Sequence, residues 1–292
     1  MNPLALVELA PLTELSTGEP EIAVGLIDGP VAVDHPDLLA ANVREVSGEP
    51  QAGGGVSSAA RVHGTFVAGI LCARRSSAAP AICPDCTLRT RPIFGDTSPG
   101  NSVAVPSATP GELAQAIVEI TEAGAHVLNL SVALAQPSSK EDRELQEALN
   151  YAAVRGVIVV AAAGNQGTLG SSAITRHPWV VPVAACDLTG IPIATSNLGS
   201  SVGRRGLMAP GDQITSLGVE SKPLTWGGTS VAAPFVTGTV ALLWSVFPNA
   251  TAAEVKSVVV GRAHGWRRTT VVPPLLDAWA AYRLMKTASG RR

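Results

Sequence analysis

The sequence predicts an α/β fold, a doubly wound, mostly parallel twisted sheet with helices on both faces. Short apolar runs without a period of two alternate along the chain with segments of helical spacing, and this alternation is typical of such sheets. Hydrophobic residues make up 46% of the 292 residues and charged residues only 15%, which indicates a sizeable buried core. In open sheets of this kind, ligands bind beyond the carboxyl ends of the strands.

Four apolar runs are predicted to be buried parallel strands, because they lack the alternation of a strand with one wet face. They are Ile22–Ile27, Leu88–Ile93, Val127–Leu130 and Val157–Ala162. After Pro178 we expect shorter strands. Asp28 follows the first run directly and Asn165 comes soon after the fourth, so both are predicted to lie at the edge of the sheet where ligands bind.

Helical spacing predicts helices between these strands and in the last part of the chain. They cover Gly64–Ala73, Glu112–Ala123, Glu141–Val154, Thr229–Phe247, Ala252–Val260 and Pro274–Lys286. Ser138 and Ser139 are expected to cap the third of these helices. His63 and Ser230 are each expected to open a helix. Two further stretches are predicted to be surface loops, Ser47–Ala60 and Gly95–Thr109.

The chain is predicted to form one domain over residues 21–286, with an N-terminal extension of residues 1–20 and a basic tail of residues 287–292. The segments that carry the chemistry span Asp28 to Ser230, so a division into two domains would split them. The formal net charge is −2, which argues against a nucleic-acid partner. The sequence does not indicate an oligomeric state.

One segment, Thr229–Phe247, is nearly apolar and has the length of a membrane span. It contains a proline, a glycine and hydroxyl residues, so a helix enclosed by a large domain is the preferred interpretation, and no membrane partner is expected. The N-terminus lacks the pattern of a signal peptide, because its apolar stretch Leu4–Leu12 is interrupted by Glu8 and Pro11 and has no basic residues before it. We therefore expect a cytoplasmic protein.

An acid, an imidazole and a hydroxyl stand in three short segments that lie far apart in the sequence. The segments are Leu26–Asp28 (LID), His63–Gly69 (HGTFVAG) and Gly228–Pro234 (GTSVAAP). A serine hydroxyl is a weak nucleophile until a base takes its proton, and the base needs an acid to fix its tautomer. Asp28, His63 and Ser230 are therefore the candidate catalytic residues. An α/β-hydrolase is excluded, because it needs the order Ser, Asp, His and a G-x-S-x-G motif.

At these residues the sequence resembles the subtilisin-like serine protease family, peptidase family S8. The segments HGTFVAG and GTSVAAP match two of its most specific signatures, and the order Asp, His, Ser is that of subtilisin. Further matches are His35–Leu38 after the acid, Ala161–Asn165, and the structural turn Met208–Gly211. The resemblance runs from about Ile22 to about Ala281.

The resemblance implies a serine endopeptidase that works through an acyl-enzyme, with Ser230 as nucleophile, His63 as general base and acid, and Asp28 orienting the imidazole. Asn165 matches the asparagine whose side-chain amide forms the oxyanion hole with the backbone N–H of Ser230. Two positions depart from the family. Gly-Pro replaces the usual Ser/Thr-Gly after the acid, which removes a backbone donor, and Phe66 stands where a second histidine is usual.

The resemblance also implies that a peptide or protein substrate binds in extended form along a strand edge. Main-chain pairing of this kind gives affinity and leaves specificity to side-chain pockets. One wall of the pocket for the P1 side chain would consist of Ser131, Val132 and Ala133, and the opposite wall of Ala162, Ala163 and Gly164. These small walls favour an apolar or medium-sized P1 residue.

No cofactor and no bound metal are expected. The calcium loop of secreted subtilisins should follow the helix of His63, but Ala73–Ile82 is short, carries Arg74 and Arg75, and has no carboxylate. Asp37 is left as a single carboxylate, against the roughly six to eight oxygens that calcium takes.

Four cysteines are too few for a disulfide scaffold in a chain of this length. The spacing of Cys83 and Cys86 is that of half a zinc site or of a redox pair. A zinc site needs a second pair, and Cys72 and Cys186 are isolated in the sequence. Three interpretations stay open: free structural thiols, a disulfide that includes Cys83 or Cys86, and zinc.

The leading hypothesis is an endopeptidase, and the compact domain with the stretch Ala79–Cys86 resembles the proteases that process ribosomally made precursor peptides of the cyanobactin type. A macrocyclase of that group would need an insertion that shields the acyl-enzyme from water, and the segment after His63 has no room for one. An inactive peptide-binding pseudoprotease is a hypothesis from a different class, and the intact triad and Asn165 argue against it. A redox or metal module built on Cys83 and Cys86 is the third.

Overall fold

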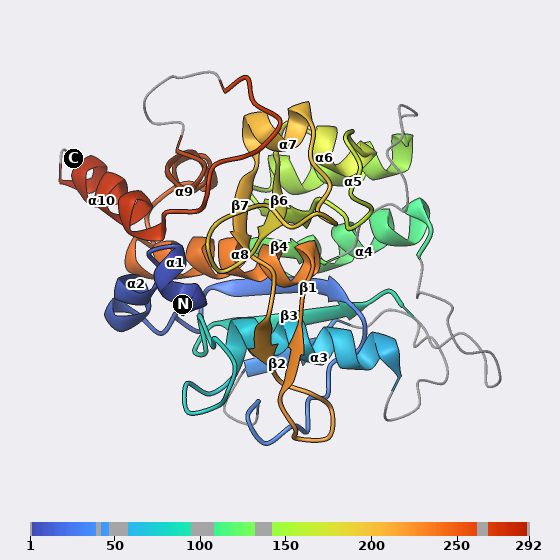
Figure 1. Ribbon diagram of the computed structural model, residues 1–292, viewed down its shortest axis with the longest axis vertical. Helices are drawn as coiled ribbons and strands as arrows, with labels where there is room; N and C mark the ends of the chain where they lie inside the picture. The colour runs from blue at the N-terminus through green and yellow to red at the C-terminus, as the bar shows by residue number, and fades with distance from the viewer. Residues whose placement is uncertain are drawn as a thin grey trace.

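The computed structural model of the chain describes residues 2–38, 42–46, 58–94, 108–131, 142–261 and 268–290. These residues contain a seven-stranded parallel sheet in the order β2-β3-β1-β4-β5-β6-β7 and a two-stranded antiparallel sheet of β8 and β9 (Figure 1). The strands are β1 Ala23–Asp28, β2 Asn42–Glu45, β3 Thr87–Pro92, β4 Val127–Leu130, β5 Ile158–Ala162, β6 Val180–Cys186, β7 Leu207–Pro210, β8 Ile214–Ser216 and β9 Leu224–Trp226. The prediction of a mostly parallel α/β sheet is confirmed.

Helices cover both faces of the large sheet. On one face, α3 (Ala59–Cys72) and α8 (Thr229–Val246) contribute to one large core cluster together with α9 (Ala252–Val259) and α10 (Ala278–Ser289). On the other face, α4 (Pro110–Glu122) and α5 (Arg143–Val154) form a second cluster. Alternate residues of one strand enter different clusters, as Val127 and Leu128 do, because successive side chains of a strand point to opposite faces. Two short helices, α6 (Ala173–Arg176) and α7 (Ser200–Arg205), flank β6.

The predicted strands lie within one residue of the observed ones, and four predicted helix starts are wrong. α4 begins at Pro110, capped by the Thr109 side chain, and not at Glu112. α3 begins at Ala59, capped by the Ser58 side chain, and reaches back into the stretch predicted to be a loop. α5 is capped by Asp142, not by Ser138 and Ser139, which lie outside the described residues. α10 begins only after Asp277. β6, which follows Pro178, is seven residues long, so the strands after that point are not all short.

Helix α8 is the apolar segment that has the length of a membrane span, with a mean hydropathy of 1.4. Within the protein, 89% of this helix is buried. The helix packs against β4, β5, β6 and β7 (Figure 1). The interpretation of this segment as a helix enclosed by the domain is therefore confirmed. An apolar surface on all sides is what a helix in the centre of a large core requires.

The first residues of the chain form two short helices, α1 (Pro3–Leu6) and α2 (Ala10–Leu15), that lie beside α10 (Figure 1). Val7, Leu9 and Leu12 are fully buried and belong to the same core cluster as α8. The segment predicted as an N-terminal extension thus packs against the domain, while the division of the chain at residues 20 and 286 stays a prediction.

Candidate active site

The carboxyl end of β1 and the helix α3 meet in an unusually close backbone contact. A Cβ atom at Gly29 would lie 2.0 Å from the carbonyl oxygen of Ala60, and a Cβ at Gly64 would lie 2.3 Å from that of Gly29. Only glycine fits both positions, because real Cβ atoms do not approach other atoms so closely. This contact places His63, the fifth residue of α3, over Asp28 at the end of β1. The prediction that His63 opens the helix is wrong, because His63 lies in the second turn of α3.

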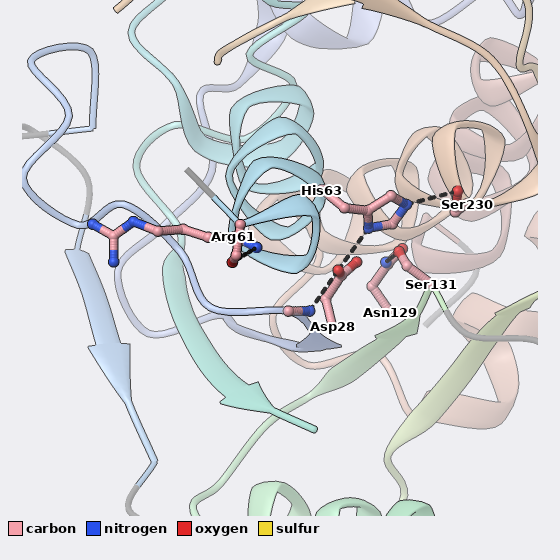
Figure 2. A network of polar contacts seen from close by, with 8 residues as sticks. Asp28, Arg61, His63, Asn129, Ser131 and Ser230 are labelled. Atoms are coloured by element: carbon pink, nitrogen blue, oxygen red, sulfur yellow. Dashed lines mark hydrogen bonds and ion pairs between the residues drawn. The ribbon is translucent and has the colours of Figure 1, made fainter. Parts of the chain in front are cut away.

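The imidazole of His63 joins the other two candidate residues. Its Nδ1 lies 2.6 Å from Oδ1 of Asp28, and its Nε2 lies 2.9 Å from Oγ of Ser230. Figure 2 shows the ring between the carboxylate and the hydroxyl, which come from β1 and α8. The three residues are thus brought together from positions far apart in the sequence. This geometry allows a proton to pass from the hydroxyl to the imidazole while the carboxylate balances the charge that forms.

Asp28 is fully buried, and the surroundings of its two oxygens differ. Oδ1 accepts hydrogen bonds from His63 and from the backbone N–H of Gly29, at 2.6 Å. Oδ2 has no hydrogen-bond partner in the described part of the chain. Pro30, which follows, has no N–H to offer. The departure from the family pattern at these residues therefore leaves the bond to His63 intact and limits the remaining bonds of the acid.

The charge of Asp28 controls the protonation of His63. Burial alone lowers the pKa of His63, but the charge of Asp28 and its hydrogen bond raise that pKa, and the net result lies above the usual value. The His63 side chain keeps 22% of its surface exposed, so solvent and substrate can reach it. A base with a pKa raised toward neutral pH is suited to take the proton of Ser230.

Ser230 lies in the first turn of α8, where backbone N–H groups have no carbonyl partner within the helix. The N-cap residue is Gly228, with a φ of 135°, a conformation that favours glycine. A Cβ at Gly228 would also lie 3.0 Å from Nδ2 of Asn165. The glycine before the serine therefore permits the backbone turn and keeps space open beside the asparagine amide.

The side chain of Asn165 is held in one orientation by Thr229. Its Oδ1 accepts hydrogen bonds from the backbone N–H of Thr229, at 2.8 Å, and from the Thr229 hydroxyl, at 3.0 Å. The Thr229 hydroxyl accepts in turn from the N–H of Gly164, at 3.1 Å. Because Oδ1 is engaged, the Nδ2 group of this exposed residue is available as a donor beside Gly228, two residues before Ser230. This arrangement can stabilise an oxyanion that forms on a carbonyl attacked by Ser230.

The predicted substrate walls begin on neighbouring strands. β4 and β5 pair through Leu130 and Ala161, so Ser131 and Ala162 come next along the two strands. Ser131 is nearly buried and accepts a hydrogen bond from Nδ2 of Asn129, at 2.7 Å (Figure 2). Ala163 and Gly164 continue the second wall and are buried. Val132 and Ala133 lie outside the described residues.

Sequence reasoning missed the residues that hold these groups in place. Asn197 fixes the loop after β5, because its amide donates to Ala163 O and Gln166 Oε1 and accepts from Gln166 N. Thr229 was visible in the GTS motif but without its role toward Asn165. Trp226 contacts the ring of His63, and no local pattern indicates that contact.

At the far end of α3, a guanidinium group lies beside the place expected for a calcium loop. Arg75 donates hydrogen bonds to the carbonyl oxygens of Thr13, at 2.5 Å, and Ser16, at 2.9 Å. The described residues contain no group of three or more His, Cys, Asp or Glu side chains that could hold a metal ion. Positive charge at these carbonyls is thus supplied by the protein itself.

All four cysteines are free and buried, which favours the interpretation as structural thiols. The pKa of Cys83 is raised, mainly by a hydrogen bond with Cys72, although the hydrogen bond of Cys83 with Cys86 acts in the opposite direction. The pKa of Cys86 is also raised, mainly by its hydrogen bond with Cys83. Burial raises the pKa of Cys186 to about 12. The thiolate is the form that reacts with disulfides and metals, so these pKa values argue against a redox module.

The fold and the Asp28–His63–Ser230 geometry define a protein of the serine peptidase type with a subtilisin-like architecture. The sequence profile of the Subtilase family, Peptidase_S8, matches residues 19–279, and the chain belongs to this family. It is 30% identical over 242 residues to subtilisin DY of Bacillus licheniformis, covering 81% of each chain.

Among solved structures, a variant of the protease domain of PatA has a TM-score of 0.83 at 29% identity, with 93% of this chain and 97% of that domain covered. The prenylagaramide maturation protease PagA has a TM-score of 0.82 at 26% identity, with coverage of 95% and 98%. The PatG macrocyclase in complex with peptide has a TM-score of 0.82 and covers 95% of each chain, but it is only 20% identical and shares the fold alone.

Proposed function

We propose that this protein is a serine endopeptidase in which Asp28, His63 and Ser230 form the catalytic triad and Asn165 completes the oxyanion hole. The observation that carries the proposal is the position of the His63 ring, with one nitrogen bonded to a buried carboxylate and the other to the hydroxyl of Ser230. Subtilisin DY and related proteases give independent support from the sequence.

The proposed reaction has two halves, acylation and deacylation. Ser230 Oγ attacks the carbonyl carbon of the scissile peptide bond while His63 Nε2 takes the hydroxyl proton. The oxyanion is stabilised by Nδ2 of Asn165 and by the backbone N–H of Ser230. His63 then gives its proton to the leaving amine as the C–N bond breaks, which produces an acyl-enzyme. Water, deprotonated by His63, hydrolyses the ester and restores the hydroxyl of Ser230.

We propose that the substrate is a ribosomally made precursor peptide, bound in extended form between Ser131 and the segment Ala162–Gly164. Ser131 directly follows β4 and Ala162 ends β5, and these two strands are neighbours in the sheet. An extended peptide can pair with backbone groups of this kind. Their small side chains suit an apolar P1 residue. The maturation proteases PatA and PagA, at 29% and 26% identity, support this substrate class. Four free thiols agree with a reducing compartment, the cytoplasm.

Hydrolysis is preferred over macrocyclisation because α3 runs without interruption from His63 to Cys72, so no shielding insertion stands in that segment. An acyl-enzyme that this segment does not shield can react with water from that side. A pseudoprotease that only binds peptides is disfavoured, since such a protein has no need for a serine bonded to a carboxylate-paired imidazole.

The decisive experiment compares the natural chain with Ser230→Ala. A sulfonyl fluoride probe is expected to label Ser230 in the natural chain, and the folded variant is expected to lose both labelling and peptide cleavage. With an unmodified peptide and excess competing amine, mass spectrometry is expected to show mainly the free acid. Full cleavage by Ser230→Ala would refute the serine mechanism, and mainly amide-bonded or cyclic product would reassign the protein as a transpeptidase.

A further inference from the structure

Trp226 lies over the face of α3 that carries His63. It is the last residue of β9, two positions before the Gly228 cap of Ser230. Its ring centroid lies 5.4 Å from that of His63, at an interplanar angle of 78°, and 5.7 Å from that of Phe66, at 81°. Because His63 and Phe66 are three residues apart on one helix, they share a face, and a single indole contacts both in the edge-to-face geometry that aromatic rings favour.

The strand pair that carries Trp226 is anchored to the helix that carries His63. The Ser216 hydroxyl, at the end of β8, donates a buried hydrogen bond of 2.7 Å to the carbonyl oxygen of Phe66. A Cβ at Gly69 would lie 2.5 Å from Ser216 Oγ, so β8 and α3 are in close contact. The Thr215 and Thr225 hydroxyls, 2.9 Å apart, link β8 to β9. Trp226 is therefore held at a defined place relative to His63, although 40% of its surface is exposed.

The polar contacts of His63 change during the proposed reaction. In the free protein its ring is bonded at both nitrogens, to Asp28 and to Ser230. Once Ser230 Oγ is acylated it has no proton to share, so the bond at Nε2 is lost. The ring is then held by Asp28 at one nitrogen and by the apolar contact with Trp226. The second half of the reaction still needs Nε2 to face the attacking water.

We propose that Trp226, supported by Phe66, is a positioning residue that keeps the His63 ring aligned while Ser230 is acylated. The proposal rests on the serine-protease function above. It predicts that loss of the indole slows deacylation more than loss of a residue that only contacts the substrate. Phe66 is fully buried and offers Trp226 an apolar ring to pack against. An ionisable ring at this position would not offer such a surface.

The test measures acylation and deacylation separately with a p-nitrophenyl ester of an N-acylated amino acid, in rapid-mixing burst experiments. The leaving nitrophenol carries no peptide, so a residue that only contacts the departing peptide has no effect on this substrate. Trp226→Ala is expected to slow deacylation by about tenfold or more, because a misaligned general base loses rate steeply. Trp226→Phe, which keeps an aromatic ring, is expected to recover most of the rate.

Leu224→Ala is the matched control, because Leu224 is two residues away on β9 and similarly exposed, at 37%. It is expected to deacylate at the wild-type rate. If Trp226→Ala does not fold, as judged by thermal melting, Trp226→Leu keeps the apolar volume without the flat ring and is expected to be slow. Wild-type deacylation in a folded Trp226→Ala or Trp226→Leu variant would overturn the inference. If the natural chain itself shows no acyl-enzyme burst, the proposed function fails instead.

Discussion

The two ends of helix α3 do different work. Near its first end, His63 is partly exposed, bonded to a serine and to a carboxylate whose second oxygen has no partner in the described part of the chain. At its last turn, Cys72 is buried next to Cys83, and the carbonyls of Ile70 and Leu71 accept from the N–H groups of Ile82 and Cys83, at 3.0 and 2.8 Å. One end carries groups that must change partners, and the other carries groups that keep theirs.

The difference shows how a rigid helix can support a reacting side chain. The chain after α3 folds back to satisfy carbonyls that a helix end leaves without partners, and Arg75 ties that region to Thr13 and Ser16. The position of α3 is thereby fixed at a distance from the chemistry. Changes at the first end should therefore affect activity, and changes at the far end should affect stability.

The largest effect is expected from Asp28→Asn. A neutral amide cannot stabilise the charged imidazole, so kcat should fall by about 10⁴-fold, the size seen when a serine protease loses this acid. In the natural chain the acid limb of kcat/KM should lie above about pH 6.5, because the pKa of His63 is raised and activity needs the neutral ring. In the variant, burial alone acts on the ring, and the limb should move to lower pH.

The same shift affects stability with a defined sign. Because the folded pKa of His63 is raised, its pairing with Asp28 stabilises the folded state fully below the unfolded pKa. This stabilisation is lost as the pH rises through the folded pKa.

Rate profiles against pH for the natural chain and for Asp28→Asn test the kinetic prediction. A limb at the same pH in both would mean that Asp28 does not set the protonation of His63.

Asn165→Ala is expected to lower kcat by about 10²–10³-fold with little change in KM, the figure known for this donor in subtilisin. The amide binds the oxyanion and not the substrate carbonyl, so the loss belongs to the transition state. Steady-state kinetics and a melting curve measure both consequences. Asn197→Ala serves as a comparison, since it loosens the loop around Asn165 without removing the donor. An unchanged kcat in Asn165→Ala, with chemistry limiting the rate, would leave Asn165 as a turn residue.

Arg75→Met tests the far end of the helix. Loss of the bonds to Thr13 and Ser16 should lower the free energy of unfolding by about 1 kcal/mol and the Tm by about 2–4 °C, while kcat stays at the wild-type value. Arg143→Met is the matched control, because the Arg143 side chain is exposed and its ion pair with Glu147 lies within one helix, where such pairs contribute little. A loss of activity in Arg75→Met at unchanged Tm would contradict the division between the two ends.

The smallest effect is expected from a calcium chelator. It should leave the activity unchanged and the Tm within about 1 °C of that of the untreated protein. Arg75 already places positive charge at the carbonyls of Thr13 and Ser16, and the carbonyl oxygen of Asp37 accepts from the N–H of Arg74. Bound calcium would stabilise the folded state by mass action. A drop of about ten degrees that calcium restores would reveal a cation site at Asp37 and contradict this expectation.

Much of this site could be predicted from the sequence, because its chemistry resides in short motifs. Asp28 follows a buried apolar run, and Ser230 stands in a glycine-flanked helix start; both signals are local. The start of α3 was not predicted, since Ala59 and Ala60 have no apolar pattern of their own and only the cap Ser58 marks the beginning. The contacts of Trp226 with His63 and of Asn197 with Ala163 join distant parts of the chain, and no periodicity reports them.

The enclosure of α8 has a consequence for biosynthesis. Ser230 lies in the first turn of a helix that packs against five strands of the sheet, β1 and β4 to β7, all of which precede it in the sequence. A nascent chain that ends before Thr229 holds Asp28 and His63 but has no nucleophile. Pairings between distant segments form late and slowly, so the serine reaches its imidazole only when the sheet is assembled. The order of the motifs along the chain thus delays proteolytic activity until synthesis of the domain is nearly complete.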